Sequence, residues 1–236
     1  MDFGQVREAA DRASARGDYI TARTALEEFL LAQPSALDES LARGTLAVLW
    51  IRLGEPDRAT EEARRAVALS STDLARASAL LSSGTVRIAR WHPDAASSEL
   101  ETTLRELSES VEIFERLGTI DFSSALLTLA DAWRELGEVE TAEPLYRRVV
   151  RDMQSARWVN ASPSHRLGLV ARALYGLTGC AVVQDRASDA RSYLDNAAEL
   201  AVEADDASII QMIASAYGEL FDDVAAMARL RRSLAT

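Results

Sequence analysis

The feature that most constrains this chain is a set of small and apolar residues that occurs twice at the same spacing. The first copy consists of Leu46, Ala47, Trp50, Gly54, Ala59 and Ala66. The second copy follows 83 residues later and consists of Leu129, Ala130, Trp133, Gly137, Ala142 and Val149. A spacing that recurs in this way is typical of one supersecondary unit used several times along a chain. The sequence therefore predicts an array of similar units, stabilised by the interfaces between neighbours.

Two weaker copies of the same spacing support the array. One consists of Ala9, Ala10, Ala13, Gly17, Ala22 and Phe29. The other consists of Leu177, Thr178, Ala181, Asp185, Ala190 and Ala197. Asp185 stands where the other three copies have glycine, so this position predicts a turn between two elements in every copy.

The spacing of apolar residues predicts that the repeated unit is a pair of helices. Apolar residues recur at helical intervals almost throughout, and no stretch shows the strict alternation of a strand. Gly, Pro, Asp and Ser separate the helical stretches. The sequence predicts about six antiparallel helical hairpins, at residues 3–34, 37–70, 72–118, 121–157, 164–204 and 207–236.

Three of these hairpins depart from the pattern. The third has Ser83 and Gly84 in its first helix and no turn glycine. Pro144 falls inside the returning helix of the fourth hairpin. A helix tolerates proline only near its beginning, so this helix is expected to start near Glu140 or Thr141. The sixth lacks most of the small residues, as expected of a terminal hairpin with one face in water.

The arrangement resembles the tetratricopeptide repeat (TPR) family. Gly17, Tyr19 and Ala22 through to Pro34 match the family's turn, packing and closing positions. Residues 142–148 look like the longer repeat of about 42 residues found in kinesin light chains, and two such repeats account for the offset of 83 residues. The resemblance implies an all-α, right-handed superhelix (α-solenoid) that forms a single domain over residues 1–236.

Within such an array, the repeated residues have packing roles. Trp50 and Trp133 each lie four residues before a turn glycine and should wedge between neighbouring hairpins. Ala59 and Ala142 should lie at the tight crossings of paired helices. We therefore assign the repeated positions to architecture, and look for function in residues that differ between copies.

Composition excludes several classes of function. The net charge of −11 disfavours direct binding to nucleic acid, because phosphate contacts dominate that affinity. No apolar run reaches the 18 residues of a membrane span. All 26 basic residues are arginine. The N-terminus has no basic segment followed by an apolar one, as a secretory leader would have. We therefore expect a cytoplasmic protein that does not associate with a membrane.

The sequence contains no recognisable catalytic or metal-binding pattern. The two histidines, His92 and His165, fall at a helix break and in a loop, far apart along the array. Cys180, the one cysteine, lies among apolar residues and is expected to be a buried thiol. Gly176 and Gly179 lack the Gly-Lys-Ser/Thr ending of a phosphate loop and are expected to allow close packing. We expect neither an enzyme nor a cofactor or metal.

Binding of a protein or peptide is the activity that the pattern favours. In a curved array the first helices line the concave face. The candidate peptide-binding residues on that face are Arg7, Asp11, Val48, Arg52, Arg87, Leu127, Asp131, Arg134, Arg172 and Tyr175. Arginines over an apolar floor suit an acidic peptide. We expect a non-catalytic adaptor, with a homo-oligomer also allowed. The alternative is a ligand- or peptide-sensing module of a bacterial signalling or transcription-control system.

Overall fold

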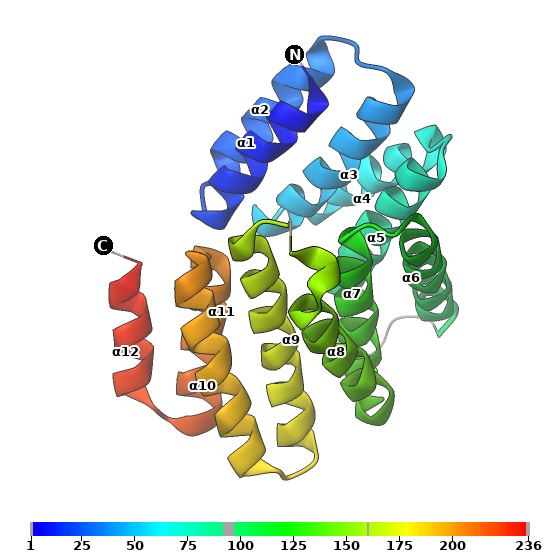
Figure 1. Ribbon diagram of the computed structural model, residues 1–236. Helices are drawn as coiled ribbons and strands as arrows, with labels where there is room; N and C mark the ends of the chain where they lie inside the picture. Colours follow the sequence, from blue (N-terminus) through cyan, green and yellow to red (C-terminus); the bar gives the residue numbers. More distant parts are fainter. Residues whose placement is uncertain (1, 92–96, 160, 235–236) are drawn as a thin grey trace. The chain divides into compact units, whose positions relative to one another are not determined.

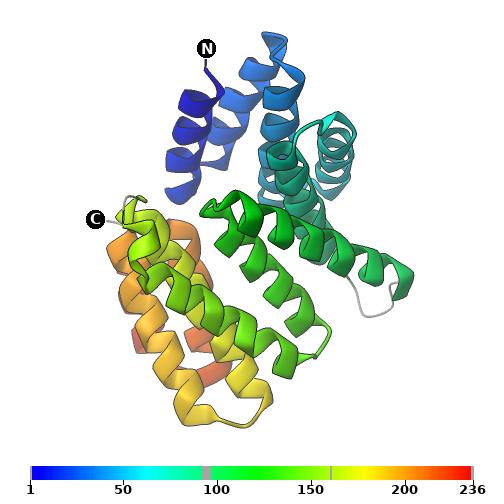
Figure 2. The ribbon, with the colours of Figure 1, turned by 45° about the vertical axis from the view of Figure 1, so that its right-hand side comes forward.

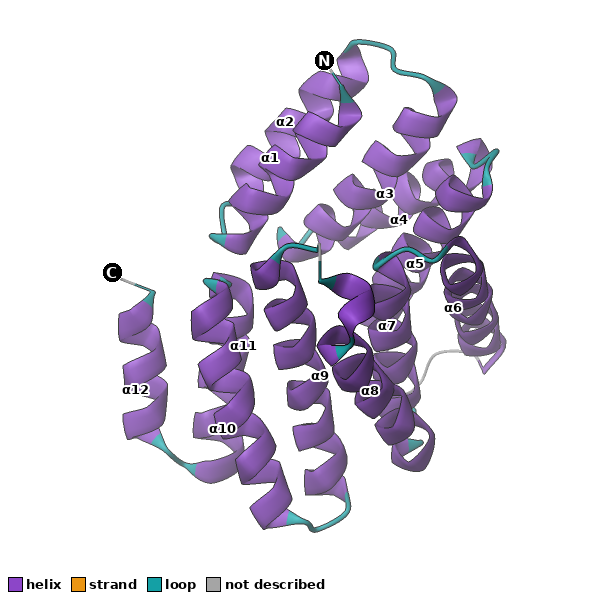
Figure 3. Ribbon diagram, viewed as in Figure 1, coloured by secondary structure: helices purple, strands orange, loops and turns teal. Residues whose placement is uncertain are grey.

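The described part of the protein is built from helices. The computed structural model describes residues 2–91, 97–159 and 161–234. Across these ranges the chain forms twelve α-helices and one short 3₁₀ helix, and contains no strand (Figure 3). The expected all-α fold class is therefore confirmed.

The helices fall into two compact units. Unit 1 comprises Met1–Leu129 and unit 2 comprises Ala130–Thr236. The helix α7 (Asp121–Glu135) contributes its beginning to unit 1 and its end to unit 2. The single domain over residues 1–236 stays a prediction.

Unit 1 consists of helical hairpins. Its complete helices are α1 (Phe3–Ala15), α2 (Tyr19–Leu31), α3 (Ala36–Arg52), α4 (Pro56–Leu69), α5 (Asp73–Arg90) and α6 (Ser97–Leu117). The helices pair as α1 with α2, α3 with α4, and α5 with α6, each pair running antiparallel (Figure 1). Helix α3 also packs on α5, so successive first helices lie side by side.

Unit 2 repeats this arrangement. After the end of α7 come α8 (Val139–Gln154), the 3₁₀ helix η1 (Ala156–Trp158), α9 (Pro163–Val183), α10 (Ala187–Ala204), α11 (Ala207–Phe221) and α12 (Val224–Ser233). The most extensive packing is between α9 and α10, the long antiparallel pair that Figure 2 shows from a second side. Helix α9 also packs against α8, and α11 pairs with α12.

Five of the turns that end first helices share one backbone conformation. Gly17, Gly54 and Gly137 have φ values of 77°, 77° and 79°. Asp185 takes the same left-handed conformation with φ 55°, and Asp222 supplies the turn of the last hairpin with φ 51°. Glycine adopts this conformation without a steric penalty, and Asp is among the few other residues that tolerate it. The repeat is therefore defined by a backbone conformation that the sequence marks with Gly or Asp.

The alanines of the two full copies of the repeated spacing are buried. Ala59 and Ala142 are both 0% exposed. Trp50 is 5% exposed within the core of unit 1. The guanidinium groups of Arg23 on α2 and Arg58 on α4 lie over its ring, at 5.3 Å and 4.8 Å from the centroid. Trp50 therefore wedges between neighbouring hairpins, whereas Trp133 is half-buried and less enclosed.

Two details of unit 2 refine the expectations. Helix α8 begins at Val139, one or two residues earlier than expected, so Pro144 lies inside the helix, in its second turn. Helix α9 is long and apolar enough to cross a membrane, with a mean hydropathy of 1.3 over its best segment. However, 56% of that segment is buried within the fold, which is typical of a core helix.

Candidate functional site

The structure brings together four of the predicted binding residues in unit 2. Asp131 and Arg134 lie one turn apart on α7, and Arg172 and Tyr175 lie one turn apart on α9. The Arg172 Nη2 atom is 3.8 Å from Asp131 Oδ2. Arg134 and Tyr175 interact electrostatically with each other and with Asp131. These four side chains are the candidate site.

A fifth residue, Tyr146, contacts the site from its buried side, although the sequence did not indicate it as functional. The Tyr146 side chain on α8 is 0% exposed, and its hydroxyl donates a hydrogen bond of 2.5 Å to Asp131 Oδ1. Burial raises the pKa of Tyr146, and the neighbouring Asp131 carboxylate raises it further. Tyr146 therefore stays protonated and holds one carboxylate oxygen of Asp131 in place.

Two glycines of α9 make this arrangement sterically possible. A Cβ atom on Gly176 would lie 2.3 Å from the Tyr146 ring. A Cβ atom on Gly179 would lie 3.0 Å from Arg134 Nη1. The expectation that Gly176 and Gly179 allow close packing is confirmed, because each leaves room for a large side chain from α7 or α8. In the sequence, these two glycines were the signal for the close approach of α9 to Tyr146 and Arg134.

Arg134 is the least satisfied charged group of the site. Its side chain is 23% exposed, and Nη2 donates a 2.7 Å hydrogen bond to Glu135 Oε1. Its Nε atom is buried without a hydrogen-bond partner. Burial opposes its charge, but neighbouring Tyr146 and Asp131 raise its pKa, so the guanidinium stays charged.

A second polar group of unit 2 has a structural role. The Glu143 side chain on α8 is 10% exposed and lies 2.6 Å from Arg147 and 2.7 Å from Arg186. Arg186 precedes α10, so this carboxylate connects α8 to the start of that helix. Since its charge is matched twice within the fold, Glu143 is a structural anchor.

In unit 1 the predicted binding residues are mostly paired or buried. Arg7 lies 3.8 Å from Asp11 and 3.2 Å from Asp121, and Arg87 lies 3.4 Å from Glu106. Local carboxylates therefore already neutralise these two arginines in part.

The remaining three predicted residues of unit 1 differ in exposure. Val48 is half-buried and Arg52 is exposed. Leu127 is 1% exposed, so the expectation that it contacts a peptide is wrong. Its side chain is packed in the core and presents no surface to a partner.

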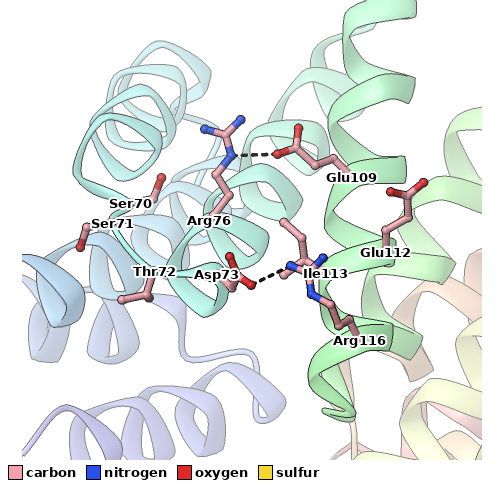
Figure 4. A pocket seen from close by; sticks show the side chains of 9 residues that line it. All are labelled: Ser70, Ser71, Thr72, Asp73, Arg76, Glu109, Glu112, Ile113 and Arg116. Atoms are coloured by element: carbon pink, nitrogen blue, oxygen red, sulfur yellow. Dashed lines mark hydrogen bonds and ion pairs between the residues drawn. The ribbon is translucent and has the colours of Figure 1, made fainter.

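A polar hollow in unit 1 lies between the beginning of α5 and the end of α6 (Figure 4). Its volume is about 370 Å³. Arg76 reaches across it to Glu109 at 2.9 Å, and Asp73 meets Arg116 at 2.6 Å. Four of its five charged side chains are paired across the hollow, and only Glu112 is not in one of these pairs.

Cys180, Trp158 and His165 lie in helices of unit 2. Cys180 is buried, and burial raises the pKa of its thiol, as expected for an unreactive cysteine. Trp158 is 8% exposed, with Arg157 over its ring at 4.6 Å. His165 lies in the first turn of α9 rather than in a loop, because that helix starts at Pro163, where proline is well suited to the first position. His92 lies outside the described residues. Across residues 2–91, 97–159 and 161–234, no group of His, Cys, Asp or Glu is arranged to hold a metal.

Known proteins resemble this chain in structure. No family model and no curated protein matches its sequence. The TPR protein TTC0263 of Thermus thermophilus is similar over 100% of both chains, with 17% identity and a TM-score of 0.60. The nearly identical TPR-like repeats of a kinesin light chain from Podosopora anserina match 84% of this chain and 94% of their own, with 16% identity and a TM-score of 0.52. PilF of Pseudomonas aeruginosa matches 98% of this chain and 96% of its own, with 18% identity and a TM-score of 0.52. At these identities the likeness concerns the fold, and the chain has the fold of TPR proteins.

Proposed function

We propose that this protein is a non-catalytic adaptor that binds a protein or peptide through the first helices of its repeats. Helical repeat scaffolds of this fold typically mediate protein interactions. The observation that carries the proposal for this chain is the gathering of Asp131, Arg134, Arg172 and Tyr175 on α7 and α9. These residues differ between the repeats, whereas the residues that repeat are engaged in packing.

The site is suited to recognition because it is held in place and still accessible. The Arg172 side chain is 37% exposed and the Asp131 side chain is 31% exposed. Behind them, Tyr146 and the glycines of α9 fix the positions of Asp131 and Arg134. A preorganised polar surface loses little conformational entropy on binding. The chain would act in the cytoplasm, with another protein as partner.

Affinity capture followed by mass spectrometry tests the proposal. The full chain is immobilised, and the proteins it recovers are compared with those recovered by an Arg172→Glu variant. Arg172 is chosen because Arg134 is largely buried, so reversing the charge of Arg134 would also disturb folding. We expect one defined partner to be lost with Arg172→Glu, while the circular dichroism spectrum is unchanged. Equal recovery by both proteins would contradict the assignment of α7 and α9.

The alternative function, a sensor of a small ligand, makes a different prediction. A metabolite that binds the folded chain would raise its melting temperature as its concentration increases. The adaptor instead gains stability only from its protein partner. Thermal melts with a metabolite panel and with the captured partner therefore separate the two functions.

A further inference from the structure

Exposed apolar side chains of unit 2 gather at the end of the unit where α9 and α11 finish. Of the ten large apolar side chains that are exposed in the described ranges, four belong to the short segments 182–183 and 220–224. Val183 is 63% exposed, Val224 is 60% exposed and Leu220 is 43% exposed. Protein surfaces rarely gather apolar side chains in this way unless a partner covers them.

The two turns that carry these side chains lie beside each other. Helix α10 begins a few residues after Val183, and Arg191 in its second turn lies 2.8 Å from Asp223, in the turn between α11 and α12. The Arg191 guanidinium also lies over the Phe221 ring, at 5.4 Å from the centroid. Figure 1 shows both turns at the same end of unit 2. We call this surface the turn edge, and it consists of Val182, Val183, Asp185, Leu220, Asp222 and Val224.

The turn edge carries two carboxylates that the described part of the chain does not neutralise. Asp185 and Asp222 are both exposed. Within residues 2–91, 97–159 and 161–234, neither side chain takes part in an ion pair or a hydrogen bond. Each carboxylate lies within two residues of an exposed valine, so charge and apolar surface alternate along the edge.

The arginines beside the turn edge are committed to other carboxylates. Arg186 lies 2.7 Å from Glu143, and Arg191 lies 2.8 Å from Asp223. Arg229, further along α12, also acts electrostatically on Asp223. The turn edge therefore keeps the negative charge of its two carboxylates.

The turns themselves do not require these carboxylates. Asp185 and Asp222 have φ values of 55° and 51°, and Gly17, Gly54 and Gly137 adopt the same left-handed conformation in other hairpins. Glycine does so without a penalty, whereas Asp is only tolerated. In the described ranges no group of His, Cys, Asp or Glu is arranged to hold a metal. An organic cation is therefore the counter-charge that fits the edge.

We propose that the turn edge is a second interaction surface, which binds a basic amphipathic segment of a partner protein. Apolar side chains of that segment cover the exposed valines and Leu220, and its lysines or arginines meet Asp185 and Asp222. Burial of the apolar side chains supplies affinity, and the charges select the partner and its orientation. This surface lies at the ends of the helices, so it goes beyond the proposed binding along the first helices.

The charge of the turn edge argues against other occupants. In a symmetric contact between two copies of this chain, the same carboxylates would face each other and repel. The surface of an anionic membrane would repel them too. A cationic segment is the occupant whose charge complements both carboxylates.

Parallel selection from one peptide library tests the proposal. Random twelve-residue peptides displayed on phage are selected against the full wild-type chain and against an Asp185→Gly, Leu220→Ser, Asp222→Gly triple variant. Peptides enriched on the wild type alone should combine Lys or Arg with Leu, Ile or Phe. The proposal is overturned if both proteins enrich the same peptides, or if the peptides specific to the wild type lack basic residues.

A matched pair of charge variants locates the contact with one synthetic enriched peptide. Fluorescence anisotropy should show binding weakened about three- to tenfold by Asp185→Gly, Asp222→Gly, the effect of losing two exposed ion pairs. The melting temperature should not fall, because glycine suits both turns. Glu203→Gln, Asp205→Gly at the other end of α10 makes the same change in net charge, with Asp205 also left-handed at φ 56°. Its affinity should stay within about twofold, and an equal loss in both double variants would refute a specific site.

A second matched pair tests the apolar part of the turn edge. Leu220→Ser should weaken binding of the same peptide about tenfold, since the leucine would be covered in the complex. Val202→Ser on α10 is the control, because Val202 is also 43% exposed, and it should bind as the wild type does. The chain should sediment as a monomer, and a dimer that Leu220→Ser dissociates would show that a second copy is the occupant. Flotation of the chain with vesicles of phosphatidylcholine and phosphatidylserine would equally overturn the proposal.

Discussion

Gly176→Ala is the substitution whose effect the packing of unit 2 predicts most sharply. The added Cβ would lie 2.3 Å from both Cε1 and Cζ of Tyr146 and 2.8 Å from Cδ1. Ordinary carbon contacts are about 3.5–4.0 Å, so the ring would have to move by roughly 1 Å. The ring is 0% exposed and its hydroxyl is hydrogen-bonded to Asp131, which leaves it little freedom to do so.

The expected magnitude combines three contributions. Overpacking of a buried ring costs about 1–3 kcal/mol. Weakening the bond to the partly exposed Asp131 carboxylate adds about 1 kcal/mol, the lower end for a charged partner that water can reach. Alanine in place of glycine within a helix returns up to about 1 kcal/mol. We expect the free energy of unfolding of Gly176→Ala to fall by about 1–3 kcal/mol.

The same helix provides a control. A Cβ on Gly168 would meet the Ile209 side chain at 3.5 Å, an ordinary contact. Gly168→Ala should therefore stabilise the protein by about 0.5–1 kcal/mol through helix propensity alone. Urea unfolding followed by circular dichroism measures both variants, with equal slopes showing that the denatured states are comparable. If Gly176→Ala proved as stable as Gly168→Ala, the close approach of α9 to Tyr146 would be wrong.

Three further substitutions test separate parts of the fold. Ala142→Leu should destabilise the protein by about 1–3 kcal/mol, because the alanine is 0% exposed and a larger side chain would be overpacked, and an unchanged melting temperature would contradict the repeat register. Tyr146→Phe should cost about 1–2 kcal/mol in urea unfolding, since it removes the donor to Asp131, and the loss should shrink in an Asp131→Ala background, which has no side-chain acceptor, if that bond is the cause. The Asp18 carboxyl caps α2 and its pKa is lowered by hydrogen bonds from Thr21, so its contribution to stability is present above about pH 4 and is lost as the pH falls further. Between about pH 6 and pH 3, Asp18→Asn should lose less stability than the wild type in urea unfolding, and parallel pH profiles would refute the capping role.

The positions of the hairpins could be predicted because their signals are local. A turn residue in the left-handed conformation must be Gly, Asp or a similar residue, and Gly54, Gly137 and Asp185 mark such turns in the sequence. Apolar residues at helical spacing then identify the buried stripe on either side. The first three hairpins were predicted to start at residues 3, 37 and 72, within one residue of the starts of α1, α3 and α5, whereas α8 stops at Gln154 rather than at residue 157, the predicted end of the fourth hairpin.

The candidate site could be predicted only in part. Asp131, Arg134, Arg172 and Tyr175 were selected as polar residues of first helices, and the structure gathers them. Leu127 was chosen from the same helices but is buried, since a helical pattern does not show which side of a stripe another helix covers. Such a choice between core and surface depends on the neighbour.

The chain's own residue pattern was sufficient to specify a helical repeat with the TPR fold, since turns and amphipathic stripes are set by residues close together in sequence. Pairing of Tyr146 with Asp131, 15 residues apart, and the fit of Arg134 against Gly179 required the packed helices. These contacts depend on how far two helices approach and how they are rotated, which no local pattern encodes. For this protein, the repeat determines where helices lie, and the interhelical contacts determine which arginines and tyrosines are buried or paired and which stay exposed.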